Sequence, residues 1–222
     1  MSDVMAGTAG GAVTLSGDES IELPEFDAPP VDPFIVLGRW LEIAVRYKVR
    51  EPGAVALATA DADGRVSNRI VLLKEIVDGA LIFTTHTESR KGRELAENPW
   101  ASVTFYWRET LQQINVCGRV ERLSAQRSDE LFAERPLAAR VATAASRQSE
   151  PLEDEGLLHE RARTLFVSGA DLGRPAGWAG YRLVPETVEF WQGRANRLHR
   201  RLLYTRTGTG TPDGWTSARL QP

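Results

Sequence analysis

Cysteine is almost absent from this chain, in which Cys117 is the only one among 222 residues. A single cysteine excludes an intrachain disulfide and a cysteine-based metal cluster. Histidine is scarce as well: the chain has three, His86, His159 and His199, and no HExxH spacing. A zinc enzyme is therefore not expected.

Long apolar runs and a strong excess of one charge are also missing. No segment approaches the roughly 18 apolar residues of a membrane-spanning helix, and no basic stretch followed by an apolar one marks a secretory signal. The net charge of −3 gives no general attraction to nucleic acid or to an anionic membrane. We therefore expect a cytoplasmic protein that binds neither, in which basic residues matter only where they cluster.

Length and composition predict one folded domain. The chain is 42% hydrophobic and 26% charged, which is ordinary for a globular protein. A chain of this length buries roughly 70% of the surface that it exposes when unfolded. Residues 2–18 are rich in Gly, Ala, Ser and Thr, so we expect a disordered segment over 1–22 and a single domain over 23–222.

Periodicity predicts a mainly β fold with added helices. The expected helices are 33–49, which Asp32 and Pro33 suit as a start, 88–97, 125–134, 137–146 and 153–167. The expected strands are 54–60, 66–73, 80–85, 101–107, 112–123, 179–184, 187–192, 198–206 and 215–220, with a loop at 169–177. Strands joined by short turns favour an antiparallel barrel, and a Rossmann fold is disfavoured because βαβ alternation and GxGxxG are missing.

A cationic stretch, Arg197-Leu198-His199-Arg200-Arg201, follows the segment 189–193. In an extended strand Arg197, His199 and Arg201 would share one face, because side chains alternate. Such groups repel one another unless an anionic or electron-rich partner lies across them, so this face predicts a binding surface. The opposite face would carry Leu198, Leu202 and Tyr204.

A second basic cluster lies where the helix over 88–97 begins. Arg90 and Lys91 fall in its first turn, where the partial positive charge of the helix N-terminus makes each cation unfavourable by a few tenths of a kcal/mol. A bound anion would reverse this effect, since helix N-termini and basic side chains both favour phosphate. The alternative is that both side chains extend into solvent.

Arg69 and Lys74 stand at the two ends of an apolar run. Strict alternation sends them to opposite faces, although that rule relaxes for Lys74 at the strand exit, and alone they would be ordinary strand-end charges. Gln113, Gln148 and Ser149 could also line a ligand site, although each alone is more often a polar residue satisfied within the fold. Trp191 is expected to be part core and part platform that could flank a planar ring.

Taken together, these segments resemble the pyridoxamine 5′-phosphate oxidase family, the FMN-binding split-barrel flavoproteins. Each matching piece is weak alone, but the set runs in family order from about residue 32 to the C-terminus. The pieces are RIVLLK at 69–74, FTT at 83–85, SRK at 89–91, NP at 98–99, Gln113, ERLS at 121–124, RP at 135–136, QS at 148–149, EFWQG at 189–193 and RLH at 197–199.

The resemblance implies a homodimer that holds FMN at the subunit interface. The residues implied to bind the FMN phosphate, its ribityl chain or the polar ring edge are Arg69, Ile70, Val71, Leu72, Lys74, Arg90, Lys91, Gln148 and Ser149. Those implied to complete the pocket are Thr84, Thr85, Gln113, Trp191 and Arg201. The anion expected at the helix start would then be the FMN phosphate, and Arg197 and His199 would fall at substrate-contacting positions.

The chain departs from the family at the substrate's phosphate. The family binds that phosphate with a Lys, a Tyr, an Arg and a Ser; Lys74 and Arg135 remain here, while Leu131 and Ala139 replace the Tyr and the Ser. The family's N-terminal segment that covers the substrate is also replaced. Each lost neutral donor would weaken phosphate binding by about 1 kcal/mol or more.

One branch of the family, the phenazine-biosynthesis FMN-dependent oxidases, resembles the chain at 23–30, 83–86, 106–110 and 219–222. This branch implies dehydrogenation of a partly reduced tricyclic phenazine carboxylate, with hydride transfer to flavin N5 and reoxidation by dioxygen to give hydrogen peroxide. Arg197 and His199 would be catalytic, with His199 handling a proton. The implied substrate-binding residues are Lys74, Arg135, Arg197 and His199. Docking with other phenazine-pathway enzymes is left open.

Two alternatives remain at this stage. One is a true pyridoxamine/pyridoxine 5′-phosphate oxidase that makes pyridoxal 5′-phosphate. The other is a flavin- or haem-binding split-barrel carrier or sensor without catalysis. The cationic face at Arg197 and His199 argues against a carrier, because a carrier needs no open substrate face.

Overall fold

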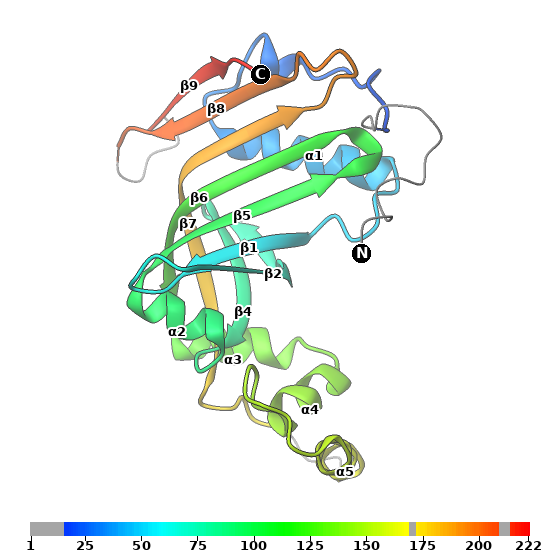
Figure 1. Ribbon diagram of the computed structural model, residues 1–222, viewed down its shortest axis with the longest axis vertical. Coiled ribbons are helices and arrows are strands. Elements are labelled where there is room, and N and C mark those ends of the chain that lie inside the picture. Colours follow the sequence, from blue (N-terminus) through cyan, green and yellow to red (C-terminus); the bar gives the residue numbers. More distant parts are fainter. Residues whose placement is uncertain (1–15, 169–171, 209–213) are drawn as a thin grey trace, which may run out of the picture.

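The computed structural model describes residues 16–168, 172–208 and 214–222, in which nine strands form one curled antiparallel sheet, a half-barrel (Figure 1). The strands are β1 (Ala54–Ala60), β2 (Val66–Leu72), β3 (Glu75–Val77), β4 (Ala80–His86), β5 (Trp100–Trp107), β6 (Gln112–Arg122), β7 (Trp178–Gln192), β8 (Arg200–Arg206) and β9 (Trp215–Leu220). The helices are α1 (Pro33–Arg46), α2 (Arg90–Glu97), α3 (Ala125–Ala133), α4 (Leu137–Ala145) and α5 (Glu155–Val167), with short 3-10 helices η1 (Pro24–Phe26) and η2 (Arg108–Thr110). The predicted antiparallel β fold with helical additions is confirmed.

The strand order explains how distant segments meet. It runs β2-β1-β5-β6-β7-β4-β3, with β8 paired to β7 and β9. β7 is 15 residues long; its first half pairs with β4, its second half with β8, and β6 pairs with both halves on the other side. One strand therefore connects the end of the molecule that carries α4 and α5 to the end that carries β8 and β9 (Figure 1).

A bulge inside β7 changes whether its odd-numbered or its even-numbered residues are buried. The register between β6 and β7 shifts next to Gly118, where β7 accommodates one extra residue, Glu186. Odd-numbered residues such as Leu183 are buried before the bulge, and even-numbered residues such as Phe190 are buried after it. Gly118 suits the close approach of β7, because an added Cβ would lie 2.0 Å from the carbonyl oxygen of Val184.

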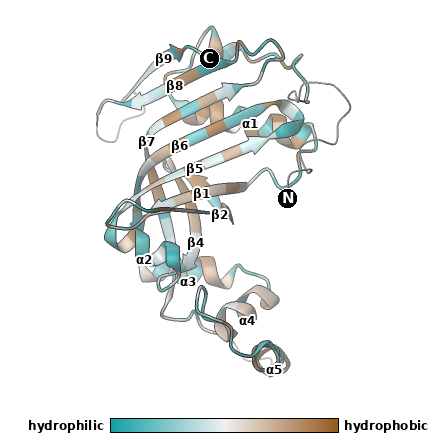
Figure 2. Ribbon diagram, viewed as in Figure 1, coloured by the Kyte–Doolittle hydropathy of each residue, from teal (hydrophilic) through white to brown (hydrophobic). Residues whose placement is uncertain are grey.

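The core lies between the sheet and helix α1. Trp40 of α1 is fully buried, with its ring 5.1 Å from that of Phe190, which lies 5.9 Å from the ring of Tyr204. α1 begins as predicted, since the Asp32 carboxylate accepts a hydrogen bond from the backbone N–H of Phe34 at 2.9 Å. Buried and less buried residues alternate along most of β6 and, after its first four residues, along each half of β7, as a sheet with one buried face requires. Figure 2 shows apolar residues interspersed with polar ones on these strands.

Several predicted elements differ from the structure in their bounds, and one strand was not predicted. α1 ends at Arg46 rather than at residue 49, because the chain turns at Lys48, whose φ is 57°. β7 is continuous through Pro185, where a break between two strands was predicted; the proline lies at the bulge, a place where strands tolerate a missing N–H. The three-residue β3 was not predicted, because it is too short to show a period.

The packed chain begins before residue 23. Residues 16–22 fall in the segment predicted to be disordered, yet Ile21 is 6% exposed and belongs to the core. Two predictions lie outside the described residues, namely disorder over 1–15 and the first part of the loop at 169–171. None of the described helices combines the length and apolarity that crossing a bilayer requires.

Candidate functional site

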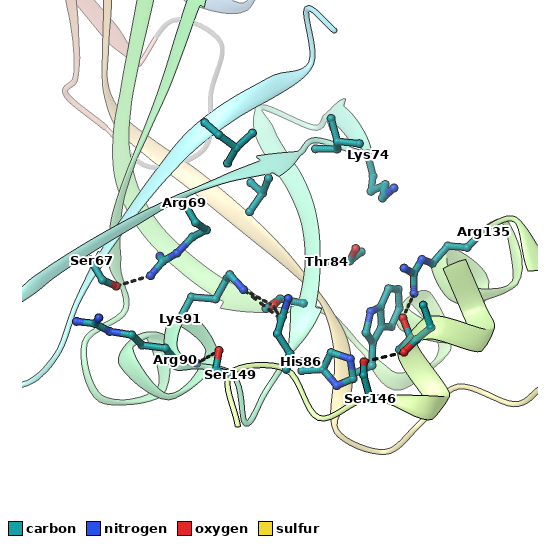
Figure 3. A pocket seen from close by; sticks show the side chains of 18 of the residues that line it. Ser67, Arg69, Lys74, Thr84, His86, Arg90, Lys91, Arg135, Ser146 and Ser149 are labelled. Atoms are coloured by element: carbon teal, nitrogen blue, oxygen red, sulfur yellow. Dashed lines mark hydrogen bonds between the residues drawn. The ribbon is translucent and has the colours of Figure 1, made fainter. Parts of the chain in front are cut away.

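A cavity of about 710 Å³ lies between β2, β4, the start of α2 and helix α4 (Figure 3). It brings together these predicted site residues: Arg69, Ile70, Val71, Leu72, Lys74, Thr84, Thr85, Arg90, Lys91, Arg135, Gln148 and Ser149. It is also lined by residues that the sequence did not single out: Ser67, Asn68, Ala142, Thr143, Ser146 and Trp178, together with His86. Basic side chains thus enter from several separate segments, which suits an anionic ligand.

Arg69 and Lys74 line the same cavity despite the alternation rule. Arg69 lies inside β2, whereas Lys74 lies beyond the last residue of that strand, Leu72. The backbone N–H of Lys74 donates to the carbonyl oxygen of Ile82 at 2.8 Å, which fixes the chain as it leaves β2. Consecutive residues of β2, from both of its faces, also line the cavity, so alternation does not keep Arg69 and Lys74 apart at this edge strand.

Helix α2 begins at the cavity wall. Ser89 is its N-cap, and its Oγ accepts a hydrogen bond from the backbone N–H of Gly92 at 3.3 Å. Ser149 Oγ accepts one from the backbone N–H of Arg90 at 3.1 Å, and Ser149 adopts a φ of 76°. Two segments that the sequence analysis considered separately, 89–91 and 148–149, therefore form one wall.

Lys91 is a buried cation in that wall. Lys91 is only 7% exposed, and its Nζ donates hydrogen bonds to Thr85 Oγ1 and to Gln148 Oε1, both at 3.1 Å. Burial and, to a smaller extent, the nearby charge of Arg69 lower the pKa of Lys91, while Glu94 raises it, and the net result is a pKa of about 8. A cation held at this cost is more stable once an anion lies beside it.

Arg135 lies on the opposite side of the cavity (Figure 3). Its Nη1 donates to Thr143 Oγ1 at 2.6 Å, and its guanidinium carbon lies 5.1 Å from the centre of the Trp178 ring. Burial lowers the pKa of Arg135. Leu131 does not line the cavity: it is 2% exposed and packs in a small apolar cluster with Ile82 and Trp178.

His86 lines both this cavity and a neighbouring smaller one of about 150 Å³. Burial lowers the pKa of His86, and the charges of Lys91 and Arg135 lower it further. The imidazole is therefore neutral at pH 7 and offers a hydrogen-bonding group rather than a further cation. The sequence signal that could have found this residue is its place beside Thr85 in the FTTH stretch.

The other predicted site residues form a second group far from the cavity. Gln113, Trp191 and Arg201 are direct neighbours across β6, β7 and β8 on the outer face of the sheet. Trp178, at the other end of β7, lines the cavity, whereas none of this second group does. At about 3.3 Å per residue, most of the length of β7 separates the two groups within one chain.

His199 packs on this second group. Its ring lies 4.7 Å from that of Trp191, and its Nδ1 accepts a hydrogen bond from the backbone N–H of Arg194 at 3.0 Å. In the neutral tautomer that fits this contact, the proton is on Nε2. Glu19, from the N-terminal segment, holds the same loop, because its Oε1 accepts from the backbone N–H of Ala195 at 2.8 Å.

The prediction that Arg197, His199 and Arg201 share one face of a strand is wrong for Arg197. β8 begins at Arg200, so residues 197–199 are not extended strand, and Arg197 turns the chain with a φ of 67°. Arg201 does lie on the outer face, where its Nε donates to Glu189 at 2.6 Å, and this bond raises its pKa. Leu202 and Tyr204 are buried as predicted, whereas Leu198 is 67% exposed.

Sequence reasoning missed Glu19, Arg194 and Glu94. The contacts of Glu19 and Arg194 join residues about 175 positions apart, which no local pattern reveals. Glu94 had a usable signal, since it lies one helical turn after Arg90 and an i, i+4 pair of opposite charge was readable from the sequence.

Comparisons with known families match nearly the whole described fold. Residues 41–168 match the model described as pyridoxamine 5′-phosphate oxidase, which includes every residue that lines the cavity except Trp178. Residues 178–222 match the model described as the pyridoxine 5′-phosphate oxidase C-terminal dimerisation region, which contains Trp191, Arg197, His199 and Arg201.

Individual relatives carry two names at similar identity. The chain is 46% identical over 209 residues to a dihydrophenazinedicarboxylate synthase of Pseudomonas chlororaphis, covering 94% of this chain and 92% of that protein. It is 47% identical over 201 residues to a pyridoxine/pyridoxamine 5′-phosphate oxidase of Burkholderia multivorans, covering 90% and 93%. The crystal structure of PhzG from Burkholderia lata in complex with tetrahydrophenazine-1-carboxylic acid aligns with a TM-score of 0.88 at 44% identity, covering 91% of this chain and 98% of that one. The chain belongs to the pyridoxamine 5′-phosphate oxidase family.

Proposed function

We propose that the protein is an FMN-dependent oxidase that dehydrogenates a partly reduced phenazine carboxylate. The observation that carries this proposal is the cavity of about 710 Å³, with Arg69, Arg90 and Lys91 gathered at the start of α2. Its size is within the range of cofactor pockets, and three cations at a helix start fit a phosphate monoester. The similarity to PhzG, solved with tetrahydrophenazine-1-carboxylic acid, supports a phenazine carboxylate as substrate.

The residues around the cavity fit FMN in separate roles. Arg69, Arg90 and Lys91 would hold its phosphate, with Ser149 at the same wall. The residues that would hold the remainder of the cofactor from this subunit are Ile70, Val71, Leu72, Lys74, Thr84, Thr85 and Gln148. When bound, FMN would supply two-electron redox chemistry between the substrate and dioxygen.

The second group of site residues would reach the cavity of a partner subunit in a homodimer. Gln113, Trp191 and Arg201 lie too far along β7 to serve the cavity of their own chain. The match of residues 178–222 to a dimerisation region supports this arrangement. In a two-fold dimer the cavity of each subunit would be completed by the outer-face residues of the other subunit, so two equivalent sites would form.

The substrate's carboxylates would lie between cations from both subunits. Arg135, held by Thr143 and Trp178, and Lys74 would approach from the cavity, and Arg197 with His199 from the partner. Since His199 carries its proton on Nε2 when Nδ1 accepts from Arg194, its role would be to donate a hydrogen bond to a substrate anion rather than to remove a proton. The substrate would lose two hydrogens, which dioxygen would gain as hydrogen peroxide.

Pyridoxine 5′-phosphate is the competing substrate, because a relative with that activity in its name is 47% identical. Lys74 and Arg135 could still contact a phosphate. At the position where the family has a tyrosine hydroxyl, this chain has Leu131. Leu131 is buried in an apolar cluster and offers no hydrogen-bond donor. We therefore favour the phenazine carboxylate.

One spectroscopic experiment tests the cofactor and the substrate together. The purified protein should show flavin absorbance, or gain it with added FMN, and the absorbance should bleach when a dihydro- or tetrahydrophenazine carboxylate is added without oxygen. Pyridoxine 5′-phosphate should bleach it far more slowly. A protein that binds no FMN, or one that turns over pyridoxine 5′-phosphate faster than the phenazine, would contradict the proposal.

Subunit mixing tests the shared site. Lys91→Met damages the cavity and His199→Ala damages the outer-face group. When subunits with different tags are co-expressed, each heterodimer should therefore keep one site in which both the cavity and the outer-face group are intact. Random mixing makes about half of the dimers mixed, so about a quarter of the wild-type activity should return from two weak variants. If the mixture is no more active than the average of the two variants, the two halves do not meet across subunits.

A further inference from the structure

Glu94 is a carboxylate placed among the cations of the cavity wall. It lies on α2 one turn after Arg90 and is 5% exposed. An acidic group beside a phosphate site would repel the ligand if it acted by charge alone. Its position therefore calls for a different role.

The contacts of Glu94 join three elements. Oε2 accepts hydrogen bonds from Thr59 Oγ1 on β1 at 2.5 Å and from Ser67 Oγ on β2 at 2.6 Å, and it lies 3.4 Å from Arg69 Nη2. Oε1 accepts one from Arg90 Nε at 2.8 Å. Both oxygens are thus used, one toward each arginine.

The two arginines differ in how much freedom they would have without this carboxylate. Arg69 Nη1 also donates to Thr59 Oγ1 at 2.6 Å, and Nη2 donates to Ser67 Oγ, a bond drawn in Figure 3. The Arg69 guanidinium is therefore held by Thr59 and Ser67 as well as by Glu94. The Arg90 side chain is 59% exposed, and Glu94 is the carboxylate that orients it. Loss of Glu94 would release Arg90 in particular.

Charge balance supports the same reading. Arg69, Arg90 and Lys91 with ionised Glu94 give the wall a net charge of about +2, which matches a phosphate monoester that carries about −2 near neutral pH. Burial alone would raise the pKa of Glu94, but hydrogen bonds from Ser67, Thr59 and Arg90 and the charge of Arg69 outweigh it and bring the pKa down to about 2. The carboxylate is therefore ionised throughout the neutral range.

We propose that Glu94 is a positioning residue that holds Arg69 and Arg90 in the geometry that binds the ligand's phosphate. This inference rests on the proposed FMN site. By charge alone, removing the negative charge of Glu94 should strengthen binding of an anion at this site. The inference predicts the opposite change in affinity, namely weaker binding, because the arginines lose their orientation.

The test compares FMN with riboflavin, which lacks the phosphate, by titrating each into the apo protein and following flavin fluorescence. For Glu94→Gln we expect FMN to bind about tenfold more weakly while riboflavin affinity is unchanged, because only the phosphate contacts lose their preorganisation. Glu97→Gln, an exposed change on the same helix, is the matched control and should alter neither affinity. A merely structural role for Glu94 would weaken both ligands alike.

An unchanged or increased preference for FMN over riboflavin in Glu94→Gln would overturn the inference. If that variant does not fold, Thr59→Val gives the answer, since Thr59 is 2% exposed, lies outside the cavity lining and contacts both Glu94 and Arg69. A reduced preference for FMN in Thr59→Val supports the inference, and an unchanged one refutes it. Wild-type protein that binds neither flavin would instead refute the proposed function.

Discussion

Replacing Lys91 by methionine should stabilise the apo protein at neutral pH and weaken its affinity for FMN. In the folded chain the pKa of Lys91 falls from 10.5 to about 8, chiefly because of burial. The gap between these values corresponds to a cost of about 3 kcal/mol, as an upper figure, for keeping the ammonium charged in the fold. Methionine fills a similar volume without that cost.

The lost hydrogen bonds offset part of this gain. Lys91 Nζ donates to Thr85 and Gln148, and each such bond contributes about 1 kcal/mol. Thr85 Oγ1 also donates to Gln148 Oε1 at 3.0 Å, so neither group is left without a partner. We therefore expect a net stabilisation of about 1–2 kcal/mol at pH 7.

The pH dependence separates this explanation from better packing. Because unfolded Lys91 keeps its proton up to about pH 10.5 and folded Lys91 loses it near pH 8, the unfolded state binds more protons in that window. Wild-type stability should therefore rise from pH 8 toward 10.5, and the advantage of the methionine variant should shrink over the same range. Urea unfolding of the apo forms at pH 7 and pH 9.5, at one fixed protein concentration, measures both effects.

Lys48→Met is the control, since Lys48 is exposed and no change in stability is expected. The reasoning is refuted if Lys91→Met is less stable than wild type at pH 7, or if its advantage does not shrink at high pH. It is also refuted if the variant binds FMN as tightly as wild type, because the buried cation would then serve no anion.

Three further outcomes follow from named contacts. Glu94, whose pKa drops to about 2 in the fold, contributes stability that is present above about pH 4.5 and lost as pH falls toward 2, so urea unfolding should show Glu94→Gln less sensitive to acid than wild type. Phe190→Ala should cost about 3–5 kcal/mol in the same assay, because Phe190 is 0% exposed, whereas Leu198→Ala, at 67% exposure, should stay within about 0.5 kcal/mol of wild type. Glu19→Ala should raise KM for a carboxylate substrate several-fold with little change in melting temperature, since Glu19 holds the loop that carries Arg197.

Each of these outcomes has a result that contradicts it. Equal acid sensitivity of Glu94→Gln and wild type would show that the carboxylate does not stabilise the fold. Equal effects of Phe190→Ala and Leu198→Ala would remove the case for a core at the α1–sheet contact. A Glu19→Ala variant with unchanged KM would show that the loop keeps its shape without this contact.

The elements with a clear period were predictable from the sequence, and those shaped by pairing were not. Helix α1 was predictable from its apolar spacing and its Asp32 N-cap. Strand β1 was predictable because the turn residues at 61–64 mark where it ends. The continuity of β7 through Pro185 was not predictable, because proline usually ends a strand and only the pairing with β6 reveals the bulge. The turn at Arg197 was missed for a related reason: a non-glycine residue with positive φ leaves no mark in the hydrophobic pattern.

The candidate site was predictable as a set of residues but not as an arrangement. The basic pair at the start of α2 could be read locally, because the cost of cations at a helix N-terminus points to a missing anion. The division of the set into a cavity group and an outer-face group depends on the register of β6, β7 and β8. Contacts such as that of Glu19 with the loop after β7 depend on chain folding over long separations.

The extra residue in β7 has a consequence for how such chains can diverge. Because Glu186 is the unpaired residue of the bulge, deleting it would leave a regular strand in which Trp191 still pairs with Gln113 on the outer face and Phe190 with Ile114 on the inner face. An insertion or deletion elsewhere in β7, with no bulge to absorb it, would instead exchange the aromatic core residues for the outer-face residues. We therefore expect the bulge to be the place in β7 where a change in residue count is tolerated.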